Sequence, residues 1–553
     1  MNASNFTPWP EWCGHPEVFL EKIRSERHRT SMDELLSLER CLCMALSLVR
    51  SSTCPINRLP IEILGDIFLL VMRPVKPKHA FIWNSSRLRH TRGLTVLTKV
   101  CRHWRDVCTN FPFLWSHISG APRDADPPIP LFLQRSRPAP LTVYLPANSI
   151  PSALSLLELE SESSRIQELF VHSFTEVAGL RYSPAPALEH LTLRADYVVP
   201  RAHQHIILFD DNVPRLKTLS IHTIDWLPSN HFASITHLCC YFSANHRPYD
   251  GPRASDLLAM LAGSSRLEDI VFVFPTFALH PQNCGSRPNA KLDHLQRLAL
   301  GGMSPTWLSW LFCHVDMPVN VAMRIFQVKS RHIFRTVHVL AQALLQHSST
   351  LLELRGSPTS SSAIFGTTAA GYSTGIRIDV NDEDHKFLHT PSLLSQLCSL
   401  RGVQELYIDI VDFTSERTID LGPLLQFLPS LSKLAYRHRS PSWQLSSSLL
   451  RFLKDCLGAE GGDSPCCPDL AVLHVIVGDS HLIFNTVVEL AEARADAGIP
   501  LREAVVGYEG DGLDGCALGQ FVQRVEMRPD HRLSRARWPT VCTTRTHRYW
   551  PAW

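Results

Sequence analysis

The chain has 553 residues, of which 44% are apolar and 19% are charged, a composition typical of a globular protein. Its 54 basic and 52 acidic residues nearly cancel, which gives no electrostatic reason to bind nucleic acid or a membrane surface. The N-terminus has no basic leader before an apolar run, and no stretch of about 18 apolar residues occurs. We therefore expect a soluble protein of the cytoplasm, the nucleus or both.

The first predicted element is a helix over about residues 32–50. Ser31 precedes Glu34 by three residues, which is a capping box, and apolar residues then recur at helical spacing. Such a helix could dimerise, but two heptads are few for a coiled coil. We favour packing of this helix against the next module.

Two further apolar helices are predicted between residues 56 and 118. Pro60 suits the first turn of a helix, and INRLPIEILGDIFLLVM then places apolar side chains on one broad face. After an extended loop over residues 73–93, the sequence LTVLTKVCRHWRDVCTN repeats this periodicity until Pro112 breaks it. A pair of this size offers more apolar surface than it can bury by itself.

The spaced pattern L-P-x-E-I-L-x-x-I-F, then V-C-R-x-W-R, then F-x-x-L-W-S closely resembles an F-box, especially the type abundant in mushroom-forming fungi. The resemblance covers residues 56–118, and IPLFLQRSRPAPLTVYL, residues 129–145, resembles the stretch that commonly follows in that group. It implies docking on the Skp adaptor of a Skp-cullin-F-box ubiquitin ligase. The implied adaptor contacts are Leu59, Pro60, Ile63, Leu64, Ile67 and Phe68, with Val100, Cys101 and Trp104 shared between the interface and the packing of the module itself.

A short pattern recurs from about residue 163 onward, in which an apolar residue is followed by others at the third and fifth positions. Its occurrences lie 19 to 39 residues apart, near the period of a leucine-rich repeat. One gap of 108 residues has room for three or four degenerate units. The first apolar positions are Ile166, Leu188, Leu216, Ile235, Leu267, Leu295, Val403, Leu431 and Leu470.

Each such unit offers a strand that buries its inward face only by stacking on its neighbours. Helical patterns such as SDLLAMLAGSS and NTVVELAEARADAGIP predict an outer layer. The predicted fold is therefore α/β: a small helical F-box module followed by an irregular leucine-rich-repeat-like solenoid, or horseshoe. A generic α/β domain remains the alternative. The expected parts are an N-terminal helical segment (1–53), an F-box domain (54–120), a linker and first strand region (121–160), a substrate-binding repeat region (161–527) and a basic-aromatic tail (528–553).

Substrate is expected on the strand surface where the side chains between the buried ones project. A Ser- and Gly-rich stretch, residues 355–375, is predicted to be a surface loop inside the array. Alternation alone nominates as substrate-binding residues His190, Thr192, Arg194, Thr218, Ser220, His222, Glu405, Tyr407 and Asp409.

One motif points to a nucleotide. Gly510, Gly512 and Gly515 match the dinucleotide-binding fingerprint between a strand-like EAVVGY and a helix-like LGQFVQRV. However, acidic residues flank these glycines where a pyrophosphate would sit, and 38 residues are too few for the rest of a nucleotide-binding sheet. We interpret the motif as a turn in the last repeat.

The tail, residues 528–553, carries six arginines and one acid with interleaved aromatic residues, a mixture that can bind phosphates and stack on bases. Because the signal is short and terminal, a tail that packs on the last repeat or stays mobile is favoured. His203 and His205 are interpreted as surface histidines. The 16 cysteines form no C-x-x-C pair, so neither zinc nor disulfides are predicted, and most are expected to be buried.

No H-E-x-x-H, G-x-S-x-G or P-loop pattern nominates catalytic groups. We therefore expect no enzyme activity, no cofactor and no metal. The expected partners are the Skp adaptor, the cullin ligase core and an unidentified protein substrate, without nucleic acid or membrane. Two alternatives remain: a non-catalytic scaffold that binds the adaptor without delivering substrates, and a hydrolase or dehydrogenase with a degenerate site.

Overall fold

The computed structural model falls into two compact units, and the described residues of unit 1 are 32–72 and 90–114. Unit 2 consists of residues 75–88 and 115–553, and its described part begins at Trp115. Its described residues are 115–119, 129–145, 160–172, 184–195, 206–223, 226–242, 254–273, 290–318, 320–329, 335–336, 338–339, 349–357, 360–366, 375–381, 400–411, 422–439, 448–455, 466–478, 481–508, 515–529, 536–547 and 549–551.

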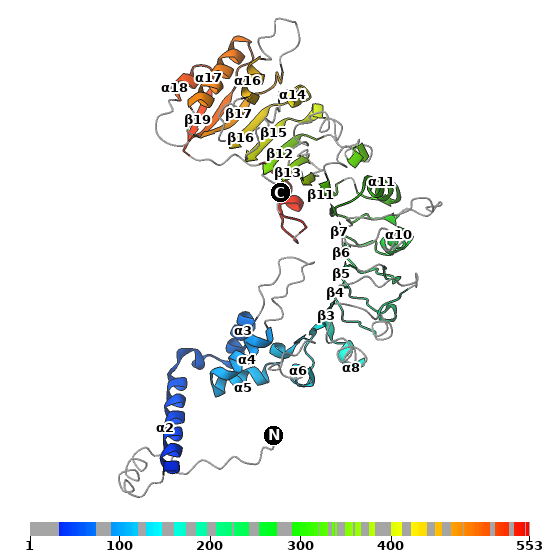
Figure 1. Ribbon diagram of the computed structural model, residues 1–553, viewed down its shortest axis with the longest axis vertical. Coiled ribbons are helices and arrows are strands. Elements are labelled where there is room, and N and C mark those ends of the chain that lie inside the picture. The colour runs from blue at the N-terminus through cyan, green and yellow to red at the C-terminus, as the bar shows by residue number, and fades with distance from the viewer. Residues whose placement is uncertain are drawn as a thin grey trace. The chain divides into compact units, whose positions relative to one another are not determined.

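Unit 1 is helical (Figure 1). The second predicted apolar helix is in fact two helices, because Cys101 is extended (φ −156°, ψ 173°) and its Sγ accepts a hydrogen bond from the Trp104 amide at 3.4 Å. The loop expected up to residue 93 also ends earlier, since a helix begins at His90. The elements are α2 (Met32–Thr53), η2 (Pro55–Arg58), α3 (Ile61–Met72), α4 (His90–Val100) and α5 (Arg102–Asn110), followed by η4 (Pro112–Trp115).

Helix α2 occupies the predicted span, but it does not pack as predicted. Its described side chains are all exposed or half-buried, and Leu46 and Val49 are 55% and 60% exposed. One contact with the rest of unit 1 is a hydrogen bond of 3.5 Å from the Arg102 guanidinium to the Met44 sulfur. The expectation that this helix packs against the next module is therefore wrong for the side chains that the structure describes.

Helices α3 and α5 meet at a glycine. A Cβ atom on Gly65 would lie 2.5 Å from the ring of Phe111, so this approach requires a residue without a side chain. Nearby, the rings of Phe68 and Trp104 lie with centroids 4.7 Å apart, and Trp104 Nε1 donates to Asn57 Oδ1 at 2.6 Å. These contacts orient α3, α4 and α5 around one small core.

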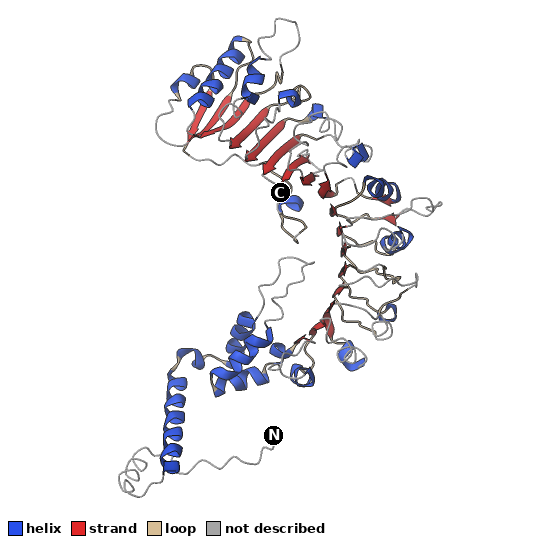
Figure 2. Cartoon of the chain, in the orientation of Figure 1, coloured by secondary structure: helices blue, strands red, loops and turns tan. Residues whose placement is uncertain are grey.

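In the described part of unit 2, seventeen strands form one sheet that is mainly parallel, so this region is mixed α/β (Figure 2). A second sheet pairs β8 (Ala290–Lys291) with β10 (Val315–Asp316). In hydrogen-bonded order the large sheet contains β1 (His117–Ser119), β2 (Leu141–Leu145), β3 (Ile166–His172), β4 (His190–Arg194), β5 (Thr218–His222), β6 (His237–Tyr241), β7 (Asp269–Val273), β9 (Arg297–Gly301), β11 (Ala322–Lys329), β14 (Gly375–Asn381), β13 (Ser360–Gly366), β12 (Leu351–Ser357), β15 (Glu405–Val411), β16 (Lys433–Arg439), β17 (Val472–Gly478), β18 (Glu503–Tyr508) and β19 (Arg524–Arg528).

The recurring sequence pattern corresponds to a recurring structure. All nine predicted first apolar residues are at most 2% exposed, and most precede a strand by two residues. In eight of them the amide closes a turn on the carbonyl three residues earlier, as from Leu188 to Ala185 at 3.1 Å. The following residue then donates to its equivalent in the neighbouring unit, as from Glu189 to Gln167 at 2.8 Å. Successive units therefore stack in register.

The 108-residue gap does not hold a series of parallel units. After β11 the chain forms β12 three positions further along the sheet, turns back through antiparallel β13 to β14 beside β11, and then continues at β15 next to β12. In the Ser- and Gly-rich stretch predicted as a surface loop, residues 355–357, 360–366 and 375 lie in these strands, whereas residues 358–359 and 367–374 are outside the described residues. Cross-strand pairing, including buried Ala363 and Ile364, explains why this polar sequence is ordered.

Helices cover one face of the sheet (Figure 2). The predicted helical patterns correspond to α10 and α17, whereas the helix-like LGQFVQRV divides into a short α18 and part of β19. None of the described helices has the length and apolar character needed to span a membrane. The helices are α6 (Ile129–Ser136), α8 (Glu160–Ser163), η6 (Phe209–Asp211), α10 (Ala254–Ala262), α11 (Pro305–His314), η9 (Leu400–Gly402), α14 (Gly422–Leu425), α16 (Ser448–Asp455), α17 (His481–Asp496), α18 (Cys516–Gly519) and α19 (Thr540–Thr543).

Gly65→Ala is expected to lower the free energy of unfolding by about 1–3 kcal/mol, because the added methyl overlaps the Phe111 ring and forces the two helices apart. Urea unfolding of the full chain, followed by tryptophan fluorescence, measures the change. Gly93→Ala in α4 is the matched control, since its Cβ would lie 3.5 Å from Met72 Cγ, an ordinary contact. Equal effects of the two substitutions would contradict the steric explanation.

Candidate functional site

Helix α3 is apolar on nearly every side. All but three of its twelve residues are large and apolar, which is more than one buried face requires. Leu64 and Phe68 point into unit 1 and are 0% and 1% exposed. In the same helix Ile61, Ile63, Leu70 and Val71 remain 48% to 67% exposed.

Exposed apolar side chains concentrate in unit 1. Among the described residues, fifteen large apolar side chains are classed as exposed, and only Ile207, Phe427 and Leu482 of these belong to unit 2. A small unit that leaves so much apolar surface in water is stable only if a partner covers it or other contacts compensate. The twelve in unit 1 are Leu36, Leu42, Met44, Leu46, Val49, Ile61, Ile63, Leu70, Val71, Val96, Val100 and Phe113.

The nine predicted adaptor contacts divide into three groups. Pro60, Ile63 and Val100 are exposed, and their side chains are accessible to a partner. Leu64 and Phe68 are core residues of unit 1, so their assignment as direct contacts is corrected: a partner cannot reach side chains enclosed by α3 to α5. Leu59, Ile67, Cys101 and Trp104 are half-buried, which fits residues shared between the core and a surface.

The sequence reasoning missed several exposed residues of the same region, namely Ile61, Leu70, Val71, Val96 and Phe113. The signal for those in α3 was present, because a helix that is apolar on all sides must bury more than one face. For Val96 and Phe113 the sequence carried no comparable signal. Only the packing of α4 and η4 decides which of their apolar side chains face outward.

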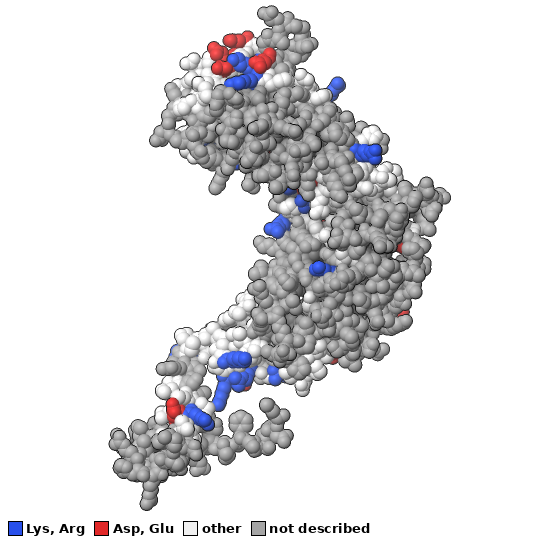
Figure 3. Space-filling view, viewed as in Figure 1, with Lys and Arg blue, Asp and Glu red and all other residues white. Residues whose placement is uncertain are grey.

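Basic side chains lie next to this apolar surface. Lys99, Arg102 and Arg105 are exposed on α4 and α5, and Figure 3 shows Lys and Arg gathered over these helices. An apolar centre with a charged rim is the usual anatomy of a protein interface.

A second candidate surface is the face of the large sheet opposite its helices. Parallel pairing without register shifts aligns equivalent side chains of neighbouring strands, as His190, Thr218, His237 and Asp269. The nine predicted substrate-binding residues alternate along their strands with buried residues such as Leu191, Leu219 and Leu406, and they lie on this face, which we call the inner face.

Most of those nine side chains are nevertheless not available. Thr192, Thr218, Ser220, His222 and Tyr407 are between 1% and 8% exposed, so their assignment as an open binding surface is wrong. Two of them contact each other instead, since the Ser220 hydroxyl lies 3.1 Å from His222 Nε2.

The remaining four side chains, His190, Arg194, Glu405 and Asp409, are half-buried. Glu405 accepts a hydrogen bond from the Tyr407 hydroxyl at 2.6 Å, and Asp409 pairs with Arg437. Burial, then this hydrogen bond to Glu405, raises the pKa of Tyr407 far above its usual value.

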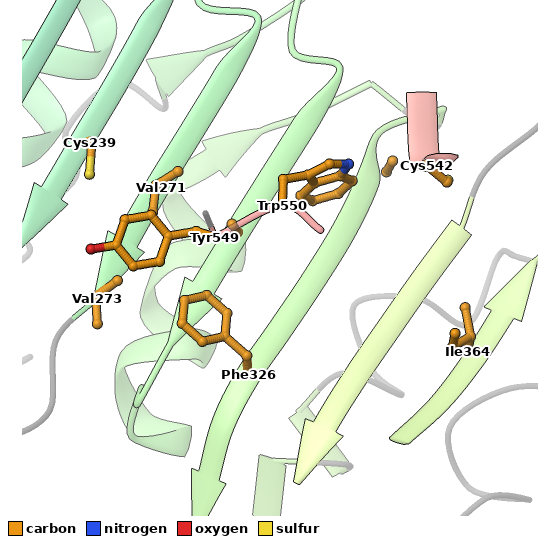
Figure 4. Packing of buried hydrophobic residues seen from close by; sticks show 10 residues of the cluster. Cys239, Val271, Val273, Phe326, Ile364, Cys542, Tyr549 and Trp550 are labelled. Atoms are coloured by element: carbon orange, nitrogen blue, oxygen red, sulfur yellow. The ribbon is translucent and has the colours of Figure 1, made fainter. Parts of the chain in front are cut away.

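The chain's own C-terminal segment, residues 536–551, lies on the inner face. Ala536 and Trp538 pack with Leu351 and Tyr407, and further along the segment Tyr549 and Trp550 are 8% and 0% exposed. Figure 4 shows the Tyr549 ring beside Val271, Val273 and Phe326. The segment therefore covers strands from β16 back to β6.

Polar contacts fix this segment at several points. Trp538 Nε1 donates to Glu353 Oε2 at 2.7 Å, and Arg324 Nη1 donates to the Tyr549 carbonyl at 2.5 Å. The Tyr549 and Phe326 rings are stacked with centroids 5.9 Å apart.

These positions correct the interpretation of the tail. It packs on strands in the middle of the sheet, not on the last repeat, and Tyr549 and Trp550 are buried. Buried rings cannot stack on bases, so Tyr549 and Trp550 are not available for the base stacking that the composition allowed. Residues 530–535 and Trp553 lie outside the described residues.

A buried carboxylate holds the C-terminal segment to β7. Asp269 is 0% exposed; it accepts from Arg297 Nε at 2.9 Å and faces His547 Nε2 at 3.3 Å. His547 Nδ1 accepts from the Tyr549 amide at 3.2 Å, so the tautomer with its proton on Nε2 makes both hydrogen bonds. Burial alone would raise the pKa of Asp269, but its contacts with His547 and Arg297 outweigh burial and lower it.

Among the described residues, no group of three or more His, Cys, Asp or Glu side chains could hold a metal ion. Five of the twelve described cysteines are buried, fewer than expected, and burial raises the pKa of Cys108 and Cys542 to about 12. His203, His205 and all but the last glycine of the nucleotide fingerprint lie outside the described residues.

Asp269→Asn is expected to lower the free energy of unfolding by about 3 kcal/mol, because the amide removes a buried charge that pairs with Arg297, whose side chain is 12% exposed. Thermal or urea unfolding of the full chain measures this loss. Asp293→Asn is the control, since the ion pair of Asp293 with Lys291 is exposed and should contribute less than about 1 kcal/mol.

The same carboxylate predicts an acid-dependent loss of stability. Because the pKa of Asp269 is lower in the folded chain than the ordinary value of 3.8, folding favours its ionised form. The contribution is fully present above that ordinary value and is lost as the pH falls through the lower folded pKa. Unfolding free energies between pH 7 and pH 2 should fall less steeply for Asp269→Asn; identical slopes would contradict this role.

Comparison with known families agrees with this geometry. A family model described as F-box-like matches residues 56–120, the stretch that contains α3, α4 and α5. No curated protein matches the chain. The chain therefore carries an F-box-like domain at residues 56–120, and such a domain indicates an adaptor-binding component of a ubiquitin ligase.

Proposed function

We propose that this protein is the substrate-recognition subunit of a Skp-cullin-F-box ubiquitin ligase. The F-box-like domain would dock on the Skp adaptor, and the sheet region would hold a protein substrate, here called the client. The single observation that carries this proposal is the exposed apolar surface of α3 and α4, within the residues that match the family model.

Physical reasoning supports docking at that surface. Apolar side chains in water cost free energy that is recovered when a complementary protein surface covers them. Ile63 and Val71 on α3 and Val100 on α4 would form the apolar centre of the contact, and exposed arginines would lie at its rim. Leu64 and Phe68 would act indirectly, since they hold α3 in place from inside the unit.

We also propose that unit 2 is an irregular leucine-rich-repeat-like solenoid. Its support is the recurring unit of buried leucine, turn and parallel strand, together with the hydrogen bonds that join equivalent residues of neighbouring units. Such an array offers a long surface on which a client can be held.

In this proposal the chain does no chemistry itself. It tethers a client near the ubiquitin-transferring subunits of a cullin ligase in the cytoplasm or nucleus, and the gain in rate comes from effective concentration. A non-catalytic chain can then determine which protein is modified.

One observation favours a second candidate, an adaptor-bound scaffold that delivers no client. The C-terminal segment and the burial of Thr218, Ser220 and Tyr407 leave less of the inner face open than a dedicated binding surface would need. Affinity capture from cells with inhibited proteasomes separates the candidates. Both predict recovery of ligase subunits, but only the recognition subunit should bring down a ubiquitinated client.

Ile63→Ala combined with Val71→Ala should weaken binding of purified Skp adaptor by on the order of a thousandfold, because central apolar contacts typically contribute about 2 kcal/mol each and every 1.4 kcal/mol is tenfold in affinity. Both side chains are exposed, so the fold should be retained. Isothermal titration calorimetry with the full chain measures the affinity, and circular dichroism checks the fold.

The matched control is Leu482→Ala on α17, which removes a similarly exposed apolar side chain from unit 2. Its adaptor affinity should equal that of the unmodified chain. Undiminished binding by the double variant, or an equal loss in the control, would refute docking through α3.

A further inference from the structure

The inner face is apolar over a limited width. From β6 to β13 the inner face carries a cluster of apolar side chains, interrupted by charged ones, namely Asp269 on β7, Arg324 on β11, and Arg377 and Asp379 on β14. On either side of this part, β5 contributes Ser220 and His222, and β12 contributes Glu353 and Arg355. We call the apolar part the inner strip. It consists of Cys239, Val271, Val273, Ala299, Ala322, Phe326 and Ile364.

The C-terminal segment fills this strip as a peptide would. Small residues such as Ala299 and Ala322 leave room that the large rings of Tyr549 and Trp550 occupy. Trp550 is fully buried there, and its Nε1 donates to the Val541 carbonyl of the same segment at 3.1 Å.

Polar groups at the edges of the strip anchor the segment. Asp269 faces His547, Arg324 donates to the Tyr549 carbonyl, and Glu353 accepts from Trp538. Two of these three anchors are carboxylates that accept from ring N–H donors. The strip therefore suits a segment that offers aromatic rings and ring N–H donors. The backbone carbonyl of one aromatic residue in that segment must also be free to accept from Arg324.

The described part of the segment does not pair with any strand of the sheet. Its regular structure is α19 and one bridge between its own residues His547 and Trp550, and none of the strand pairings includes it. Among the described residues, its departure would therefore break no strand pairing of the seventeen-stranded sheet.

We propose that the inner strip is a peptide-binding site whose resident ligand is the chain's own C-terminal segment, and that a client presents a competing peptide of the same chemistry. That peptide would carry adjacent aromatic residues preceded at short distance by a histidine or another nitrogen donor. This inference rests on the proposed function, because it supplies the client class for that function.

The C-terminal segment competes with any client peptide for the inner strip. A tethered ligand acts at an effective concentration of roughly millimolar, so a free peptide of equal intrinsic affinity binds the intact chain much more weakly. Client access then depends on loosening or removing the segment.

The experiment uses the full chain with a protease recognition site replacing residues 530–535, so that folding occurs with the segment in place and cleavage follows. The probe is a fluorescein-labelled synthetic peptide of residues 536–553. Its affinity for the cut chain, after gel filtration to remove the released segment, and for the uncut chain is measured by fluorescence anisotropy. The control probe is the same peptide with Tyr549→Ala and Trp550→Ala.

The proposal expects the cut chain to release its segment, keep its circular dichroism spectrum and bind the probe at least about tenfold more tightly than the uncut chain. The control probe should not bind. A segment that never dissociates, a sheet that unfolds on release, or equal binding of both probes would overturn it. A chain that exchanges segments in stable dimers would also overturn it, because the occupant would then be a second copy.

Binding of purified Skp adaptor is measured on the same cut and uncut chains. Failure to bind adaptor would count against the proposed function, whatever the probe does. Normal adaptor binding with no probe binding would count against the inner strip alone.

Discussion

Several elements of this protein carry more apolar surface than they can bury by themselves. Another segment of the chain, or a partner protein, must cover the rest. Helices cover one face of the large sheet, and the C-terminal segment covers the inner strip from β6 to β13. On α3 and α4, residues such as Ile63, Leu70 and Val96 remain in water. The free energy of burying apolar surface is the common driving force, and its incomplete satisfaction in unit 1 is what makes that unit a binding element.

The sheet gains its regularity from the backbone. Units close a turn at a buried apolar residue, and backbone amides of one unit donate to carbonyls of the neighbouring unit, as from the Lys433 amide to the Gln404 carbonyl. Equivalent side chains therefore line up in rows. Rows of small apolar residues make a place for the rings of the C-terminal segment. Rows of charged residues pair with one another, as Arg437 does with Asp409, and so remain stable without a partner.

The proposed adaptor docking and the proposed client binding would therefore differ in whether the surface concerned is already open. The apolar surface of α3 is exposed, so adaptor docking there would need no displacement within unit 1. The inner strip is occupied, and the buried pair of Asp269 with His547 holds its occupant in place. A ligase subunit built in this way would join its complex readily while admitting only those clients that compete with its own terminus.

The sequence by itself determined the repeating units, because each needs a buried leucine such as Leu188 or Leu431 at the same place before its strand. It also determined the surplus of apolar residues in α3. It could not show that β13 runs antiparallel, that Leu64 points inward while Ile63 points outward, or that Trp550 lies beneath β6 to β13 in the core and not on the surface. The periodicity of the sequence indicates which residues must be buried. Which segment buries each of them depends on packing between segments far apart in the chain, as between Asp269 and His547, and this is decided only in the tertiary structure.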